Sequence, residues 1–210
     1  MSGTTSVLSD DSLLSKLDRS LFRVERWLAL LSGLAVFSLM LLAVVSVGGR
    51  NFFSQPLPGY VDWIEQIMPL IAFMGVAYTQ RGGGHIRMDI FVGMFQGRAL
   101  WLIEFITTIL VLMLMVLLVW GSWAHFERSF DWNAQMWSRD SSIDIALPMW
   151  PAKLLAPIAF SVLSLRLTLQ AWGFARAFIS GTTRPVALPL IADAATQAAR
   201  EAAQLAGRDT

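Results

Sequence analysis

Residues 27–49, WLALLSGLAVFSLMLLAVVSVGG, decide the fold, because these 23 consecutive positions between Arg26 and Arg50 carry no charge. A helix of this length rises ~34 Å, enough to cross a hydrocarbon core of ~30 Å. Twelve of the 23 residues are Leu, Val or Phe. At ~0.4 kcal/mol each on the membrane-insertion scale, they favour insertion by ~5 kcal/mol. The stretch therefore predicts a transmembrane helix.

A second predicted span, residues 101–125, is equally apolar. After Glu104, 22 consecutive positions carry no Asp, Glu, Lys or Arg. Trp101 begins the segment and Trp123 stands near its end. Their separation of ~33 Å along a helix suits the two aromatic belts of a bilayer.

Two weaker spans are predicted over residues 60–80 and 152–175. The first contains Pro69, which we expect to kink the helix or to end its first turns. The second contains Arg166, whose central charge costs ~2.5–3.5 kcal/mol. Ten Leu, Ile, Val and Phe residues offset this cost by ~4 kcal/mol. The sequence thus predicts an all-α integral membrane protein with four transmembrane helices.

The distribution of Lys and Arg predicts the orientation of these spans. With Arg166 left aside, the two tails and the second connection hold 11 basic residues, whereas the first and third connections hold four. By the positive-inside rule, both termini and the second connection are expected to be cytoplasmic.

The composition excludes several classes of protein. Hydrophobic residues make up 55% of the 210 residues and charged residues only 15%, too little charge to coat a water-soluble globule. The net charge is +1 without a long basic block, so we expect no binding of nucleic acid. The chain has no cysteine, which removes disulfides, thiol nucleophiles and thiolate metal sites.

The N-terminal segment 1–26 is expected to form an amphipathic arm. Leu13, Leu17, Leu21 and Leu28 recur at helical spacing, with basic residues between them. Two arrangements fit this pattern: a helix that lies on the inner membrane surface before the chain turns inward, or a straight cytoplasmic extension of the first span.

The other segments outside the spans have distinct compositions. Residues 81–100 begin with three consecutive glycines, which predict a sharp turn, followed by a short interfacial helix from Asp89 to Phe95. The outer loop 126–151 is rich in Trp and is expected either to dip into the headgroups or to pack on a protein partner. The tail 176–210 is expected to be a weakly packed cytoplasmic segment.

Two polar side chains within the spans are candidates for a functional role. Glu65 is either an ion or proton site or an interfacial carboxylate that pairs with Arg50. Arg166 is expected either to extend toward the inner headgroups or to pair with a carboxylate on a neighbouring chain. A small ion channel would need one of these two residues to line an oligomeric pore.

A membrane anchor for a redox enzyme is the alternative from another functional class. Such anchors bind haem between pairs of histidines. The two histidines here, His85 and His125, are predicted on opposite faces of the membrane, so they would not ligate one iron. We therefore expect no cofactor, no metal and no catalysis in this chain.

The stretch 50–89 carries a series of positions in a specific order, ending in an R-x-G-G-H-I-x-x-D run. The positions are Arg50, Phe52, Phe53, Pro56, Pro58, Gly59, Glu65, Phe73, Gly75, Ala77, Arg81, Gly83, Gly84, His85, Ile86 and Asp89. With the four-span layout, this stretch resembles the small membrane subunit of tripartite ATP-independent periplasmic (TRAP) transporters, the DctQ-type family. An extra glycine before His85 and a longer, more aromatic third connection depart from the family pattern.

The resemblance implies a scaffold subunit in a bacterial inner membrane. In this family a periplasmic binding protein delivers a solute, commonly an organic acid, to a large elevator-type membrane subunit driven by an ion gradient. The small subunit packs beside the large one, within the lipid, and binds no solute itself. By this likeness the residues expected to hold the fold or the subunit contact are Arg50, Glu65, Arg81, His85, Arg87 and Asp89, to which Arg166 is added as a buried candidate.

Overall fold

The computed structural model describes residues 12–55, 57–81 and 98–181. This part of the chain is helical and contains no strand, with only isolated bridges between Phe130 and Ser138 and between Ser141 and Pro148. The elements are α1 (Leu13–Phe53), α2 (Tyr60–Met74), α3 (Val76–Arg81), α5 (Arg98–Ser129), the 3-10 turn η1 (Gln135–Trp137) and α6 (Trp150–Ser180). The all-helical fold expected from the sequence is confirmed for these residues.

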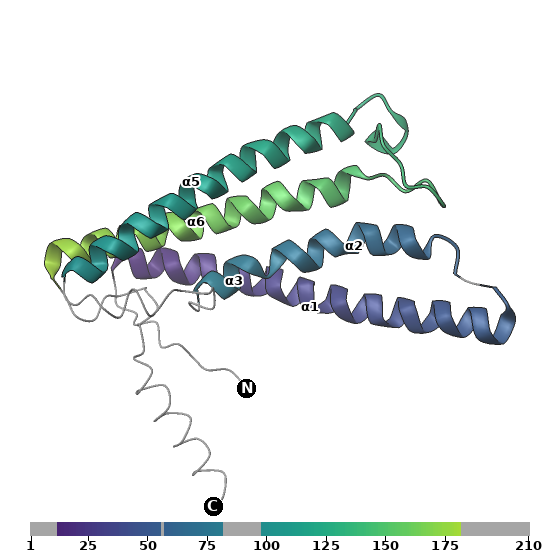
Figure 1. Ribbon diagram of the computed structural model, residues 1–210, viewed down its shortest axis with the longest axis horizontal. Helices are drawn as coiled ribbons and strands as arrows, with labels where there is room; N and C mark the ends of the chain where they lie inside the picture. The colour runs from purple at the N-terminus through teal and green to yellow at the C-terminus, as the bar shows by residue number, and fades with distance from the viewer. Residues whose placement is uncertain (1–11, 56, 82–97, 182–210) are drawn as a thin grey trace, which may run out of the picture.

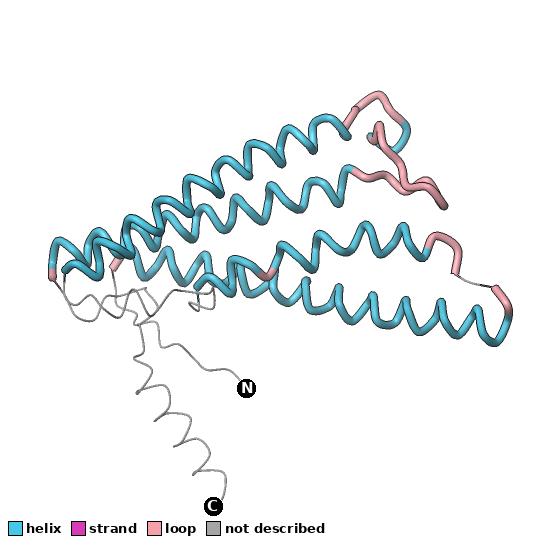
Figure 2. The backbone as a smooth tube through the Cα atoms, viewed as in Figure 1, coloured by secondary structure: helices cyan, strands magenta, loops and turns pink. Residues whose placement is uncertain are grey.

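The helices form a flat layer of two hairpins (Figures 1 and 2). α5 packs along α6, α6 packs on α2 and α3, and these two pack on α1, so that α1 and α5 lie at opposite edges. The hairpins converge where α1 begins and α6 ends, and they spread apart toward the opposite end. In this arrangement the first turn of α1 and the last turn of α6 lie at the same end of the molecule.

Within the described part of the chain, three helices are long and apolar enough to cross a membrane: α1, α5 and α6. They contain the predicted spans 27–49, 101–125 and 152–175, respectively. The predicted span 60–80 is divided between α2 and α3, each of which is too short to cross a bilayer alone. A crossing by this segment therefore remains a prediction.

The division between α2 and α3 falls at Gly75, six residues after Pro69, and α2 runs on through the proline. The backbone N–H of Gly75 bonds to Phe73, so it does not reach the carbonyl of Ile71, its ordinary helical partner. Ser32 Oγ of α1 donates to this carbonyl oxygen at 3.1 Å. The neighbouring helix thus satisfies a buried acceptor that the break leaves open.

α1 is one continuous helix of 41 residues that passes through Arg26 without a turn. Ser12 caps its start, and no Gly or Pro interrupts the sequence between residues 13 and 26. Of the two expected arrangements, the structure has the straight extension. Of the leucine stripe, Leu13 and Leu17 are exposed and Leu21 and Leu28 are half-buried, whereas Asp18 and Glu25 are buried.

α6 is the most enclosed of the helices and forms the centre of the layer. Small buried residues on it, among them Ala159, Ala171 and Ala177, let neighbouring backbones come close. Aromatic rings also pack between α6 and its neighbours. Phe73 of α2 contacts Phe160 edge to face with ring centres 5.2 Å apart, and Trp101 of α5 stacks on Phe174 with ring centres 6.2 Å apart.

We predict that Gly59→Ala lowers the free energy of unfolding by about 1–2 kcal/mol. Gly59 precedes α2 with a φ of 68°, which costs a residue with a side chain free energy. A Cβ there would also lie 2.4 Å from Ile145 Cδ1. Denaturant unfolding in detergent, followed by tryptophan fluorescence, measures the change.

The matched control is Gly121→Ala in α5, where a Cβ meets no atom within 4 Å. Because Ala favours a helix over Gly, this variant is expected to be neutral or more stable by up to ~1 kcal/mol. An equal loss of stability in the two variants would contradict the assigned role of Gly59.

Candidate functional site

The most unusual feature of the fold is a guanidinium buried among the helices, that of Arg166 in α6. Its side chain is 1% exposed. Nε and Nη2 donate to the two carboxylate oxygens of Glu25 in α1, both at 2.6 Å. Nη1 donates to Asp18 Oδ1. The arginine therefore forms a two-bonded fork with one carboxylate and a third bond to another, the geometry for which a planar guanidinium is suited.

A second arginine completes this cluster. Arg81, the last residue of α3, donates from Nη2 to Asp18 Oδ2 at 2.8 Å and from Nε to Asp18 Oδ1 at 3.3 Å. Its guanidinium carbon also lies 3.9 Å from the centre of the Phe22 ring, a cation–π contact. We call Asp18, Glu25, Arg81 and Arg166 the buried ion cluster.

A pair of amides continues the polar contact between α3 and α6. Gln80 Nε2 donates to Gln170 Oε1 at 2.9 Å, and Gln170 Nε2 donates back to the carbonyl of Gln80 at 3.4 Å. Gln170 is one helical turn after Arg166, so it lies on the same face of α6. The ion cluster and this pair together join three helices at the converging end.

The ion cluster is electrically neutral, with two carboxylates and two guanidinium groups. Each carboxylate oxygen accepts at least one hydrogen bond. No buried side-chain N or O among the described residues lacks a partner. A buried charge that loses its partner costs ~3–5 kcal/mol, so the folded state depends on all four groups being present together.

The depth of the cluster follows from its partners. Glu25 stands just before the charge-free stretch 27–49, and Arg166 lies beside it. The cluster thus lies beside the start of the apolar stretch of α1. The structure gives Arg166 an arrangement that the sequence did not suggest, in which its carboxylate partners belong to the same chain.

The structure brings together only some of the predicted site residues. Arg81 and Arg166 share the buried ion cluster. Arg50 lies in the last turn of α1 and Glu65 is exposed on α2; among the described residues no ion pair joins them, so the expected pairing is not found. His85, Arg87 and Asp89, with the predicted glycine turn and interfacial helix, lie outside the described residues.

Sequence reasoning missed both carboxylates of the cluster. Asp18 and Glu25 are seven residues apart and so lie on one face of α1, which is the signal that could have identified them. The leucine stripe adjoins these carboxylates on α1 and gives the more familiar pattern, that of an amphipathic helix. In a helix that meets lipid, the polar face is the one that turns inward to its protein partners.

A second polar centre orders the outer loop against the start of α2. Asp62 accepts hydrogen bonds from Ser142 Oγ at 2.6 Å and from the backbone N–H groups of Asp144 and Ile145 at 3.1 and 2.8 Å. Gln66 Nε2 donates to the carbonyl of Pro148 at 2.7 Å. These bonds tie the connection between α5 and α6 to the other hairpin at its spread end.

Tryptophan rings and an ion pair hold the rest of the outer loop. Phe130 contacts Trp132 and Trp150 edge to face at 4.9 and 5.6 Å. Lys153 Nζ lies 2.6 Å from Asp140 Oδ2. Hydrogen bonds from Lys153 and Ser129 hold the pKa of Asp140 below its ordinary value of 3.8.

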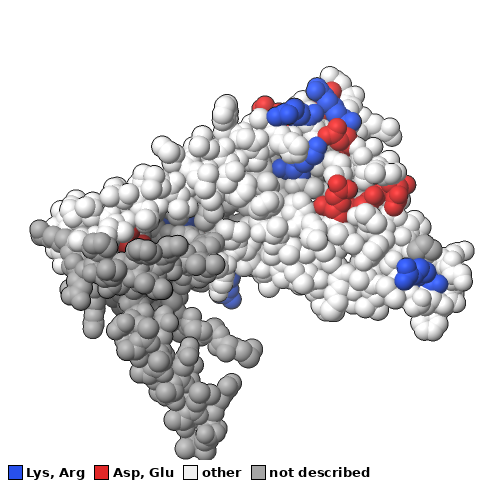
Figure 3. Space-filling model, in the orientation of Figure 1, with Lys and Arg blue, Asp and Glu red and all other residues white. Residues whose placement is uncertain are grey.

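Charges are unevenly distributed over the molecule. On the face shown in Figure 3 they gather over the outer loop and the nearby helix ends, whereas the middle of the face is uncharged. Among the described residues, no group of three His, Cys, Asp or Glu side chains is placed to hold a metal. The arrangement therefore describes a helical membrane protein whose buried charges pair with one another.

The comparison with known families agrees with this description. The family model for tripartite ATP-independent periplasmic transporters, DctQ component, matches residues 39–177. This is well over half of the chain, so the chain belongs to the DctQ family, the small membrane subunit of TRAP transporters and a transporter component rather than an enzyme. No curated protein matches the chain. The match begins after Asp18 and Glu25, so the acidic half of the ion cluster lies outside it.

We predict that Glu25→Ala lowers the free energy of unfolding by about 3 kcal/mol or more, because Arg166 then keeps only Asp18 as a carboxylate partner. Unfolding in detergent measures this change. The control is Glu65→Ala, which removes an exposed carboxylate from α2 and is expected to change stability by less than ~0.5 kcal/mol. Similar losses in the two variants would show that the cluster is not a source of stability.

Proposed function

We propose that this chain is the static scaffold subunit of a TRAP transporter in a bacterial inner membrane. It would stand beside a large elevator-type membrane subunit that receives a small organic acid from a periplasmic binding protein and imports it with an ion gradient. The chain itself would bind no solute and undergo no transport cycle. Its membership of the DctQ family supports a role as a subunit of a TRAP transporter. Its geometry supports the assignment of solute binding and transport to the other two proteins.

The observation that carries the proposal is that both arginines of the buried ion cluster are already paired with carboxylates of the same chain. A solute site buried among the helices needs a buried cation that is free to bind the carboxylate. Both guanidinium groups of the cluster are instead bound to Asp18 and Glu25. These ion pairs join α1, α3 and α6. Such contacts suit a subunit that stays fixed while its neighbour moves.

The flat layer of helices supports the same role. α1 and α5 lie at the two edges, and most of their apolar side chains face outward, for example Phe37 on α1 and Leu114 on α5. These edge helices therefore leave much of their apolar surface uncovered by the rest of the chain. Lipid or a larger membrane subunit would cover these faces, and the layer would widen the immobile part of the complex.

We further propose four membrane crossings with both ends in the cytoplasm. α2, Gly75 and α3 together make 22 residues, ~33 Å if they cross in line. The first turn of α1 and the last turn of α6 lie at one end, in agreement with an even number of crossings. The excess of Lys and Arg in the two tails and the second connection supports a cytoplasmic position for both ends of the chain.

The outer loop would then face the periplasm and help to dock the binding protein. A hydrogen bond from Ser142 to Asp62 of α2 holds the loop in place. The side chains of Trp132 and Ile143 on this loop are 74% and 97% exposed. A fixed loop with exposed apolar side chains is suited to a transient protein contact. In this proposal the loop does not bind the solute, which is bound by the binding protein and the large subunit.

The proposal is tested by reconstitution of this chain with the large membrane subunit of a TRAP transporter from the same organism. We expect the purified chain alone to give no uptake of radiolabelled short carboxylic acids into proteoliposomes. With the large subunit it should copurify in a stable complex, and with the binding protein and an imposed sodium or proton gradient the complex should import one of these acids.

Two results would contradict the proposal. Uptake by this chain alone would make it a transporter in its own right. Full activity of the large subunit and binding protein without this chain would remove its role as a required scaffold. A haem absorbance band in the purified chain would favour the redox-anchor alternative.

A further inference from the structure

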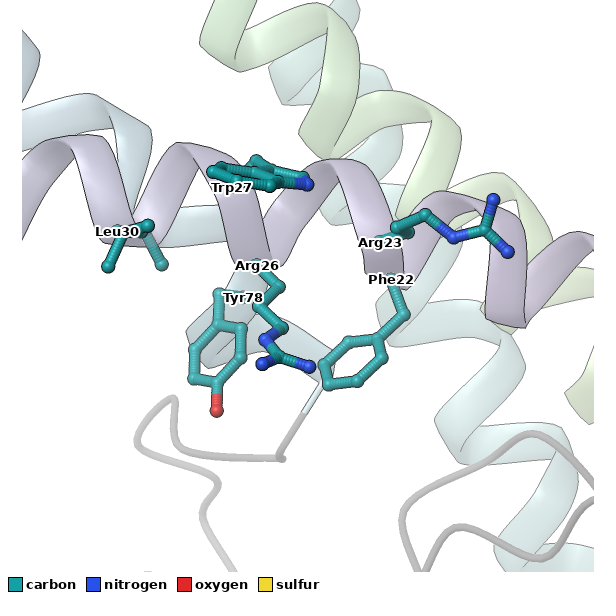
Figure 4. Close-up of a pocket in the computed structure, with 7 residues that line it drawn as sticks. Phe22, Arg23, Arg26, Trp27, Leu30 and Tyr78 are labelled. Carbon is teal, nitrogen blue, oxygen red and sulfur yellow. The ribbon is translucent and has the colours of Figure 1, made fainter.

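A groove lies beside the ion cluster, between the first half of α1 and the short α3. It has a volume of about 740 Å³ and is lined by Phe22, Arg23, Arg26, Trp27, Ala29, Leu30 and Tyr78. Figure 4 shows the side chains of Phe22, Arg26 and Tyr78 grouped together. Arg23 extends away from this group along α1, and Leu30 lies along the helix in the other direction. The Phe22 and Tyr78 rings stack at 5.8 Å, so α1 and α3 form the walls together.

The groove contains two cations that the fold does not use. Arg23 and Arg26 are exposed, and within the described part of the chain neither guanidinium has a carboxylate partner. The nearby Arg81 differs, because Asp18 and the Phe22 ring both bind it. Arg23 and Arg26 stand three residues apart on the helix, where like charges repel unless an anion lies between them.

The groove is apolar on the side away from these arginines. Trp27 is 63% and Leu30 51% exposed, and both belong to the start of the charge-free part of α1. Leu34, one turn further, is also exposed. The surface therefore offers two positive groups at one end and a continuous apolar strip at the other, which matches an amphiphile with an anionic head and a hydrocarbon tail.

We propose that this groove binds an anionic phospholipid. Its phosphate accepts hydrogen bonds from Arg23 and Arg26, and an acyl chain lies along Trp27 and Leu30. The inference does not depend on the scaffold role; only the leaflet that supplies the lipid, the cytoplasmic one, rests on the orientation proposed above.

The test is native mass spectrometry of the full-length chain in detergent, titrated with phosphatidylglycerol. We expect the wild-type chain to retain one lipid, and Arg23→Gln/Arg26→Gln to weaken this binding about tenfold or more. The matched control is Arg50→Gln/Arg128→Gln, which removes two exposed arginines from the opposite end of the molecule with the same change in charge. It should bind the lipid as the wild type does.

Two competitors identify the occupant. Phosphatidylcholine, with a neutral head, should bind at least several-fold more weakly, and inorganic phosphate should not displace phosphatidylglycerol. Equal binding of the two lipids, displacement by phosphate, or an equal loss in both double variants would each overturn the proposal. Because no partner and no transport enters this assay, its outcome is independent of the proposed function.

A second readout uses the wild-type chain and therefore does not require the glutamine variant to fold. Phosphatidylglycerol with brominated acyl chains should quench the tryptophan fluorescence of the wild type more than that of Trp27→Phe. The control is Trp120→Phe, which removes an exposed tryptophan from the second half of α5, a helix that does not line the groove. If Trp27→Phe lost no more of the quenching than Trp120→Phe, the acyl chain would not lie in this groove.

Discussion

The structure depends on one constraint: the guanidinium of Arg166 is buried among apolar helices and must not be left unpaired. Lipid tails offer no hydrogen bonds, so the partners must come from the protein. Glu25 and Asp18 supply them from α1. This requirement fixes the rotation of α1, since Asp18 and Glu25 must turn toward α6.

The same pairing explains how the two hairpins are joined. Asp18 also binds Arg81, which holds α3 against α1 and α6 at the converging end. At the spread end, Asp62 and the outer loop make the second connection between the hairpins. The layer is therefore fastened at both ends by polar contacts, while its middle relies on small residues and aromatic rings. This distribution suits a component that keeps its shape beside a moving neighbour.

The sequence predicted α1, α5 and α6 because a membrane helix needs only length and apolar side chains, and both can be counted. It did not predict the partners of Arg166, because Glu25 and Asp18 are 141 and 148 residues away along the chain. The break at Gly75 was also missed, since Pro69 carries the stronger local signal. Of the family motif, Arg81 could be tested and belongs to the buried ion cluster, whereas His85, Arg87 and Asp89 lie outside the described residues.

A double-mutant cycle between Glu25 and Arg166 tests the central claim most directly. The free energies of unfolding of Glu25→Gln, Arg166→Gln and the double variant would be compared with that of the wild type in the same detergent. If these side chains hold α1 to α6, the two changes should be coupled by about 2 kcal/mol or more. Effects that add to within ~0.5 kcal/mol would contradict the account, because they would show that the two groups do not interact.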